Sequence, residues 1–311
     1  MSVNYGDFIH PDDAAARREL ESVAGFDKLT KLYMKLGVEK LLQSLFMAEK
    51  IRLSPTQLPE YYNLLPPVCE KFGIKEPQFY LEMSPIPNAY TVGDNETFLV
   101  VTSGLLEYMS RDEQQAVIAH ECGHILCRHV FYNTLAMLLI SWANNTGFFG
   151  EALNSPIILG DILGTLAAPL RLALNYWSRK SELSADRAEV VFMGSSAATV
   201  RGLIRLAGGP SAITANVNIE EYAKQADTYQ QMYDSSTWQK ILQGSEIMNR
   251  SHPFNAVRVR EVLAWEKSAQ FIKLREAILS GGLSEEPAVC MKCGNSIKKG
   301  SKYCRYCGFE Q

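Results

Sequence analysis

The sequence lacks the marks of several large classes of protein. Its net charge is only −3, so neither a nucleic acid nor an anionic surface is expected as a bulk partner. It contains no internal repeat and no low-complexity tract, and its 47% hydrophobic content is ordinary for a folded protein. The first residues carry acids early and form no apolar core, which excludes a signal peptide and an Arg-rich transit sequence. The expected location is therefore cytoplasmic.

Long apolar runs are missing as well. The stretch 134–170 comes closest, but its two apolar segments, 134–143 and 157–170, are too short or too interrupted by Asn, Gly and Pro. A convincing membrane-spanning helix needs about 20 apolar residues. Two interpretations of 134–170 stay open. Its helices are buried or line a hydrophobic substrate channel, or they contact a membrane surface, which would make the protein peripherally membrane-associated.

Cysteine is scarce, with seven residues in 311, and the odd number argues against a disulfide framework. Four of the seven form two C-x2-C pairs near the C-terminus, and each pair is followed by glycine. Each pair places two thiolates at the spacing of a tetrahedral zinc site, and so short a module needs bound metal to fold. We expect a structural zinc ribbon at 290–311, held by Cys290, Cys293, Cys304 and Cys307.

Histidine is scarcer still, with five residues, yet two of them fall in the pentad HECGH at 120–124. On a helix, His120 and His124 lie on one face, so their imidazoles can bind one zinc ion. Glu121 lies about 100° round the helix from His120, near the open side of the metal, where it can reach a water molecule. Chance would produce this pattern in roughly 1% of such chains, so a metal-binding helix is the favoured interpretation.

The segments around the pentad predict its structural setting. Three β-prone segments, at 78–83, 89–92 and 97–102, predict a small antiparallel sheet just ahead of it. Ser110 and Glu113 match a capping box, which predicts a helix from there to about residue 134. The pentad then falls in the middle of that helix.

A second carboxylate-bearing helix is predicted at 171–193. It contains Glu182 and Asp186, which share one helix face because they are four residues apart. In isolation such a pair indicates a solvated acidic face. Behind an HExxH pentad, however, Glu182 is a candidate third metal ligand, since helical zinc sites often take a downstream glutamate.

Further along the chain the signals weaken. A turn at 251–254 contains His252, which is either a structural turn residue or an active-site residue, and both interpretations stay open. An amphipathic helix is predicted over 256–279, and the composition of 281–289 indicates a linker.

The pentad, the Glu182-x-x-x-Asp186 pair and the segment Asn88-Ala89-Tyr90 together make the sequence resemble HtpX-like zinc metallopeptidases. This gluzincin family includes the CAAX prenyl endopeptidases, and the resemblance covers about residues 60–265. It implies an α+β, mainly α, zincin-type core with two metal-binding helices at 56–280, preceded by a helical region at 1–55. Those enzymes are integral membrane proteins, and the ribbon lies outside their pattern, so prenylated substrates do not follow.

The resemblance also implies roles for individual residues. His120, His124 and Glu182 would bind the catalytic zinc, Glu121 would be the general base, and Asp186 would orient a ligand histidine. The strand at 97–102 would be the sheet edge that accepts the substrate as an added strand. The substrate-strand candidates are Asn88, Leu99, Val100 and Val101, and the candidate oxyanion donors are His252 and Arg258.

The function predicted is that of a zinc-dependent metalloendopeptidase, which cleaves protein or peptide substrates with a zinc-bound water activated by Glu121. It would hold one catalytic and one structural zinc ion. The alternative is a catalytically silent, chaperone-like or adaptor protein that recruits a partner protein through the ribbon. The complete set of ligands together with Glu121 favours the enzyme, because a binding protein is free to lose the general base.

Overall fold

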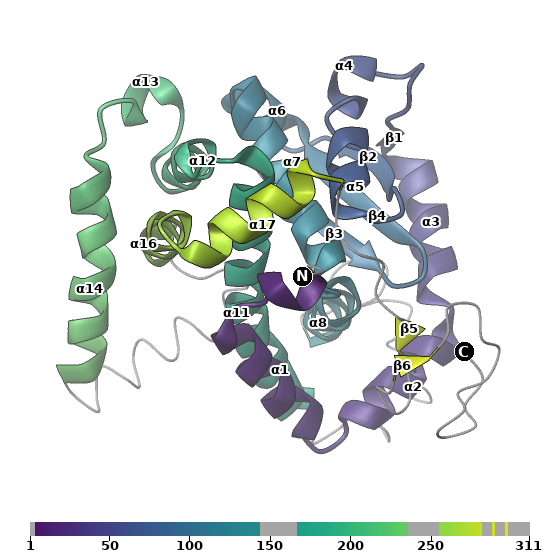
Figure 1. Ribbon diagram of the computed structural model, residues 1–311. Helices are drawn as coiled ribbons and strands as arrows, with labels where there is room; N and C mark the ends of the chain where they lie inside the picture. The colour runs from purple at the N-terminus through teal and green to yellow at the C-terminus, as the bar shows by residue number, and fades with distance from the viewer. Residues whose placement is uncertain (1–3, 144–166, 236–254, 282–287, 290–295, 298–311) are drawn as a thin grey trace.

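The structure is a computed structural model of the chain, and it describes residues 4–143, 167–235, 255–281, 288–289 and 296–297. Most of the described chain is helical, and the helices surround one small sheet (Figure 1). The predicted class, α+β and mainly α, is confirmed at this level.

Three helices precede the sheet. After a 3-10 turn, η1 (Tyr5–Phe8), they are α1 (Pro11–Ser22), α2 (Phe26–Leu36) and α3 (Val38–Glu49). Gly25 and Gly37 separate them, with φ angles of 90° and 60° that only glycine adopts without strain. The N-terminal region is therefore helical as predicted, but it is divided where these glycines reverse the backbone.

The sheet contains β1 (Ile51–Arg52), β2 (Gln78–Glu82), β3 (Ala89–Gly93) and β4 (Thr97–Thr102), in the order β1-β2-β4-β3. β4 pairs antiparallel with β3 but parallel with β2, so the prediction of an antiparallel sheet is wrong. The loop after β2 carries the chain past one strand position, and the β3–β4 hairpin then returns β4 into the gap. β4 is consequently an interior strand of a mixed sheet.

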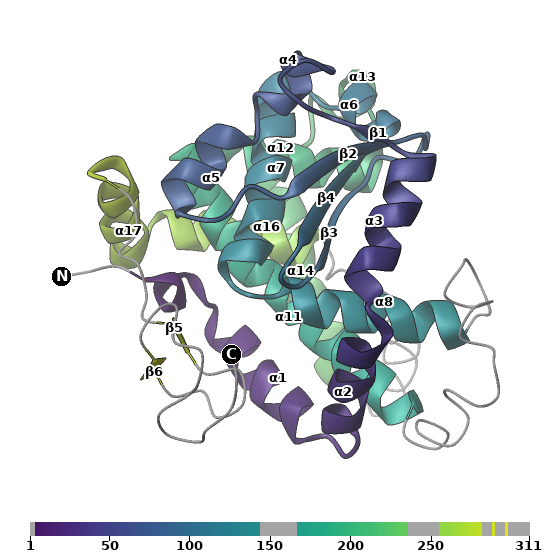
Figure 2. The same ribbon diagram turned by 90° about the vertical axis from the view of Figure 1, so that its right-hand side faces the viewer.

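Helices cover both faces of this sheet, and Figure 2 shows it between α3 and α7. On one face, Phe46 of α3 packs edge-on against Tyr80, with ring centroids 5.7 Å apart. On the other face, Leu99 of β4 and Cys122 of α7 belong to one buried cluster. Cys122 is therefore a packing residue of the core. The shorter helices nearby are α4 (Pro59–Tyr62), α5 (Pro66–Phe72) and α6 (Ser103–Tyr108).

The helix that carries HECGH is α7 (Arg111–Leu126), and its predicted capping box is present, with the backbone N–H of Ser110 donating to Glu113 at 2.8 Å. The helix ends eight residues earlier than predicted. Arg128 adopts a left-handed backbone, with φ of 59°, and α8 (Val130–Ala143) starts in a new direction. The break turns His129 back, so that its backbone N–H donates to the carbonyl oxygen of His124 at 2.9 Å.

The second half of the described chain is helical. The helix predicted over 256–279 is divided at Ser268, whose hydroxyl accepts the backbone N–H of Phe271 and caps a new helix. The helices are α11 (Ala167–Met193), α12 (Ala197–Gly208), α13 (Ser211–Thr214), α14 (Ile219–Ser235), α16 (Asn255–Glu266) and α17 (Ala269–Leu279). A strand pair joins β5 (Ala288–Val289), at the end of the predicted linker, to β6 (Ser296–Ile297), within the predicted ribbon, whose four cysteines fall outside the described residues.

Gly123, inside the pentad, allows α7 and α11 to approach closely. A Cβ atom at this position would lie 3.0 Å from the carbonyl oxygen of Ala185 and 3.0 Å from the Cβ of Ala188. Both contacts are tighter than ordinary packing allows, so glycine fits the crossing best. This close crossing carries the histidines of α7 up against Glu182 of α11.

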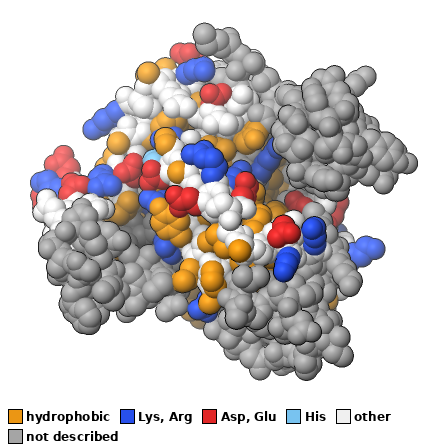
Figure 3. Space-filling view, turned by 90° about the horizontal axis from the view of Figure 1, so that it is seen from below, with side chains coloured by type: hydrophobic (Ala, Val, Ile, Leu, Met, Phe, Trp, Pro, Cys, Tyr) orange, Lys and Arg blue, Asp and Glu red, His pale blue; other side chains and the backbone are white. Residues whose placement is uncertain are grey.

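Within the described ranges, we find no helix of the length and apolarity that a bilayer span requires. Seen from below, hydrophobic side chains lie interspersed with Lys, Arg, Asp and Glu over the described part of the surface (Figure 3). The segment 144–166, which holds most of the apolar stretch, lies outside the described residues. Both interpretations of that stretch stay predictions.

Candidate metal centre and active site

Three side chains from α7 and α11 meet at a buried point. The Nε2 atom of His120 lies 3.4 Å from Oε2 of Glu182, and the Nε2 atom of His124 lies 3.3 Å from Oε1 of the same carboxylate. All three residues are buried, and their ligand atoms lie within 4.8 Å of one another. The sequence placed these residues on two helices, and the fold brings them together.

The donor set fits zinc. Two imidazole nitrogens and one carboxylate form a set typical of catalytic zinc sites, which leave a further coordination position open. The electrostatics agree, because this point favours a cation. Burial alone would lower the pKa of His120, but hydrogen bonds to Asp186, Glu182 and Glu189 outweigh burial and raise that pKa well above its usual value. A bound metal ion would supply the positive charge that these carboxylates favour.

Asp186 fixes the orientation of His120. Its Oδ1 atom lies 3.0 Å from Nδ1 of His120, so the imidazole keeps its proton on Nδ1 and leaves Nε2 free for a metal. Burial opposes the charge on Asp186, but Arg258 lowers the pKa of its carboxyl below the ordinary value. This contact is the one expected of a residue that orients a ligand histidine.

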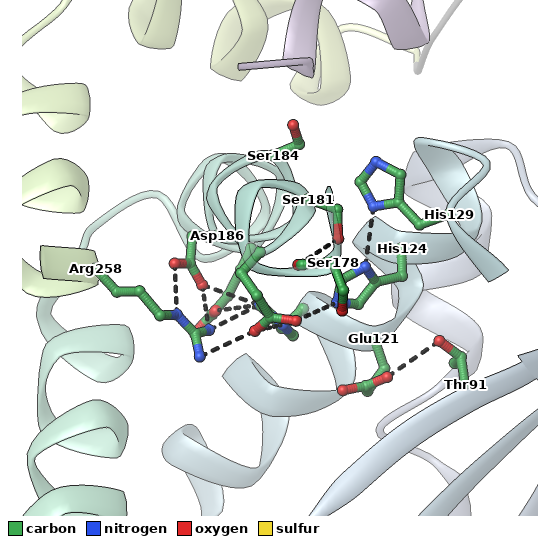
Figure 4. Close-up of polar contacts among 12 residues, drawn as sticks. Thr91, Glu121, His124, His129, Ser178, Ser181, Ser184, Asp186 and Arg258 are labelled. Atoms are coloured by element: carbon green, nitrogen blue, oxygen red, sulfur yellow. Dashed lines mark hydrogen bonds and ion pairs between the residues drawn. The ribbon is translucent and has the colours of Figure 1, made fainter. Parts of the chain in front are cut away.

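Arg258 of α16 is buried within the same cluster. Its Nε and Nη2 atoms donate to the two oxygens of Asp186 at 2.8 and 2.6 Å, as Figure 4 shows. Its Nη1 atom lies 3.1 Å from Oε2 of Glu182. The guanidinium therefore supports a ligand and the residue that orients another ligand. It also lines the cavity described next, and its predicted role as an oxyanion donor stays a prediction.

A cavity of about 660 Å³ opens beside the three ligands. Glu121 lines it, and the hydroxyl of Thr91 on β3 donates to Oε2 of Glu121 at 3.2 Å (Figure 4). Other lining residues come from the start of β3, from α7 and from α12; they include Asn88, Ala89, Val117, Thr199, Gly202 and Leu203. The general-base candidate thus faces a space large enough for part of a substrate.

The predicted substrate strand is partly wrong. Leu99, Val100 and Val101 are fully buried in β4, an interior strand that has no free edge for another strand. Asn88, by contrast, lines the cavity just before β3, which is one of the two terminal strands of the sheet. The hydrophobic pattern marked the strands, but it could not show which of them lies at the edge.

Residues 236–254 lie outside the described part of the chain, and His252 is among them. Both interpretations of this histidine therefore stay open. Glu189 was not predicted at all, although its Oε2 atom lies 3.4 Å from Nδ1 of His120. Burial is the main cause that raises the pKa of its carboxyl. Because Glu189 is one helical turn beyond Asp186 on the same face, helical spacing was the available signal.

Two further residues were missed as parts of the site. His129 lies against the ring of His124, and Asp13 of α1 lies against His129. Burial lowers the pKa of His129 to about 4, so this imidazole is neutral at physiological pH. Burial opposes the charge on Asp13 too, but His129 and Ser184 hold the pKa of that carboxyl well below its usual range. No local sequence pattern connects Asp13 with the pentad.

Two imidazoles and a carboxylate on crossing helices, beside a glutamate that faces a cavity, define a zinc metallopeptidase centre. Residues 60–266 match the model of peptidase family M48, and the chain belongs to this family. It is a zinc metallopeptidase, a hydrolase that acts on protein substrates.

Known relatives agree with this assignment. The chain is 29% identical, over 270 residues, to the plastoglobule-localized metallopeptidase 48 of Arabidopsis thaliana, described as chloroplastic, and the match covers 86% of this chain and 74% of that one. It is 30% identical over 203 residues to a protease HtpX homolog of Sulfurihydrogenibium, covering 60% and 67%. The crystal structure of S. mikatae Ste24p matches with a TM-score of 0.40 and 17% identity, covering 76% of this chain and 61% of that one. The family match and the HtpX homolog confirm the resemblance to HtpX-like enzymes at the level of the family.

Proposed function

We propose that the chain is an endopeptidase in which His120, His124 and Glu182 hold the catalytic zinc and Glu121 is the general base. The observation that carries this proposal is the position of Glu121, which lines the cavity beside the three ligands and is held by Thr91. When bound, zinc supplies Lewis acidity, which acidifies water and polarises a carbonyl group.

The protein's own groups then move one proton. Glu121 takes a proton from the water as the water oxygen bonds to the carbonyl carbon of the substrate. It then gives that proton to the nitrogen of the scissile peptide bond as the C–N bond breaks. The Thr91 hydroxyl, which donates to one oxygen of Glu121, leaves the other oxygen for the water. Asp186 and Arg258 hold His120 and Glu182 in place, so that the ligands do not rearrange during the reaction.

The edge of β3 is the site we propose for an extended substrate. The backbone N–H of Thr102 donates to the carbonyl oxygen of Asn88, so these two residues form a hydrogen-bonded pair at the start of the β3–β4 ladder. In an antiparallel ladder, residues that bond to the partner strand alternate with residues whose backbone groups face the other way. The backbone groups of Ala89 and Thr91 therefore point away from β4, on the side of β3 where the described residues form no further strand. A peptide added along this edge would pass Glu121, which Thr91 contacts.

A pocket between α7 and α12 would receive one substrate side chain. Gly202 of α12 is buried in its wall, yet a Cβ atom added there would meet no atom within 4 Å. The space in front of Gly202 is therefore open, and its neighbours Val117 and Leu203 are apolar. We propose that this pocket accepts a large apolar side chain.

The substitution Gly202→Leu should fill this pocket without unfolding the helix, since leucine is a better helix former than glycine by roughly 0.8 kcal/mol. Cleavage of peptides with a large apolar side chain at the selected position should fall about 10- to 100-fold relative to peptides with alanine there. A peptide library, compared between the parent, Gly202→Ala and Gly202→Leu, measures the change. An unchanged preference in the leucine variant would exclude this pocket as the specificity site.

The C-terminal ribbon remains part of the proposal. We propose that Cys290, Cys293, Cys304 and Cys307 hold a structural zinc ion and that the ribbon recruits a partner protein, as it would in the adaptor alternative. The Arabidopsis relative is described as plastoglobule-localized, and from this we favour the interpretation in which 134–170 contacts a membrane surface over the one in which its helices are buried or line a channel.

Metal analysis of the full chain tests both zinc ions. The parent should hold two zinc ions, and the double variant Cys290→Ser/Cys293→Ser should hold one and still cleave a short peptide. A chelator that removes all the zinc should stop cleavage, and added zinc should restore it. One zinc ion in the parent, unchanged in the double variant, would exclude the ribbon site, while zinc-loaded protein that cleaves no substrate would favour the adaptor alternative.

A further inference from the structure

A buried row of three side chains connects the N-terminal helix to the metal-binding helix. The Oδ2 atom of Asp13, on α1, lies 2.9 Å from Nε2 of His129. The Nδ1 atom of His129 in turn lies 2.9 Å from Nδ1 of His124, a contact drawn in Figure 4. Asp13 and His129 are 0% exposed and His124 is 3% exposed, so water does not compete for these contacts.

The protons in this row have one consistent arrangement. Asp13 accepts from three donors, which are Nε1 of Trp177 at 2.9 Å, the hydroxyl of Ser184 at 2.6 Å and the His129 ring. An ionised carboxylate donates nothing, so His129 must carry its proton on Nε2. The Nδ1 atom of neutral His129 is then an acceptor, and Nδ1 of His124 must be the donor.

This arrangement leaves Nε2 of His124 without a proton, 3.3 Å from Glu182. An unprotonated Nε2 is the state in which a histidine binds a metal ion. We propose that Asp13 is a positioning residue of the metal centre, which fixes the tautomer of the ligand His124 through His129. The proposal rests on the assignment of His124 as a zinc ligand. Asp13 lies outside residues 60–266, which match the family model.

The surroundings of α1 hold Asp13 in this position. The backbone N–H of His10 donates to the hydroxyl of Ser184 at 2.9 Å, and Arg17 donates to the carbonyl oxygen of Cys127 at 2.9 Å. These contacts fasten α1 to α11 and to the break after α7, the segment that carries His129. A purely structural role for Asp13, as an anchor of α1, is therefore the alternative that an experiment must separate from positioning.

The substitution Asp13→Asn separates the two roles. The carboxamide has the same size, but its NH2 group must face one of the three donors that the carboxylate accepts. If it faces His129, the proton of that ring moves to Nδ1, where it opposes the proton on Nδ1 of His124. We expect zinc affinity, measured by chelator competition on the full chain, to fall about 10- to 100-fold. Asp12→Asn is the matched control, because it weakens the ion pair that fastens α1 to Lys180 of α11 at 2.7 Å and leaves the contact between Asp13 and His129.

The expected pattern is a large loss of zinc affinity in Asp13→Asn and an affinity close to the parent in Asp12→Asn, whose melting temperature falls slightly. Nitrogen-15 NMR of the zinc-loaded parent should show His129 protonated on Nε2 and His124 on Nδ1, a measurement that does not depend on any variant folding. A parent with His129 protonated on Nδ1, or an Asp13→Asn protein that binds zinc as tightly as the parent, overturns the inference. If instead zinc in the parent leaves the His124 resonances unchanged, the ligand assignment itself fails.

Discussion

The variant Glu121→Gln should bind zinc like the parent and cleave peptides about 10²- to 10⁴-fold more slowly, the range for a lost general base. The glutamine keeps the size of the side chain and an oxygen that can accept from Thr91, but it cannot take a proton from water. None of the three ligands is altered, because Glu121 is not among the residues that meet at the metal point. The measurements are the initial rate on a library-derived peptide and the zinc content of the same sample.

Two controls make this result specific. Thr91→Val removes the hydroxyl that holds Glu121 at 3.2 Å but leaves the carboxylate, so the rate should fall only modestly, by about 10-fold. A sample of each variant with excess chelator measures cleavage by any contaminating protease. If Glu121→Gln cleaves within tenfold of the parent after that correction, Glu121 is not the general base.

The parts of the site that are marked by local sequence patterns could be predicted from the sequence. The pentad, its capping box and the spacing of Glu182 and Asp186 all depend on helical periodicity within a few turns. The structure adds the role of Gly123, whose missing side chain allows the two helices to cross closely enough for Glu182 to meet the histidines. This glycine is a feature of the pentad that periodicity alone does not explain.

The predictions that were wrong or missing concern features that depend on contacts between residues far apart in the sequence. The alternation of apolar residues identifies a strand, but the position of β4 between β2 and β3 is set by how the hairpin packs. The end of α7 at Leu126 had no glycine or proline signal, since Arg128 adopts the left-handed backbone instead. Asp13 could not be found either, because its partners are far away in the sequence and no local pattern marks a residue that supports a histidine.

The buried ion pairs of Arg258 at the metal centre predict that its loss has a large effect on stability. Arg258→Met should lower the free energy of unfolding by about 3–5 kcal/mol, the usual cost when one partner of a buried ion pair is removed. The guanidinium lies against Asp186 and Glu182, and Glu189 also contributes to holding its charge. Without it, these buried carboxylates repel one another and lose their donors. Urea unfolding in the presence of chelator measures the effect on folding separately from zinc binding.

Arg260, two residues further along α16, offers a matched control. It forms ion pairs with Asp227 and Glu261, but its side chain is 36% exposed, so Arg260→Met should cost no more than about 1 kcal/mol. Arg258→Lys keeps a charge but loses the paired contacts to Asp186, so its loss should lie between the two. If Arg258→Met costs no more than Arg260→Met, the buried network does not stabilise the fold.

An Arg258→Lys variant that folds and binds zinc like the parent but cleaves slowly would instead support the predicted role of Arg258 as a donor to the oxyanion, because only that role depends on the guanidinium during the reaction.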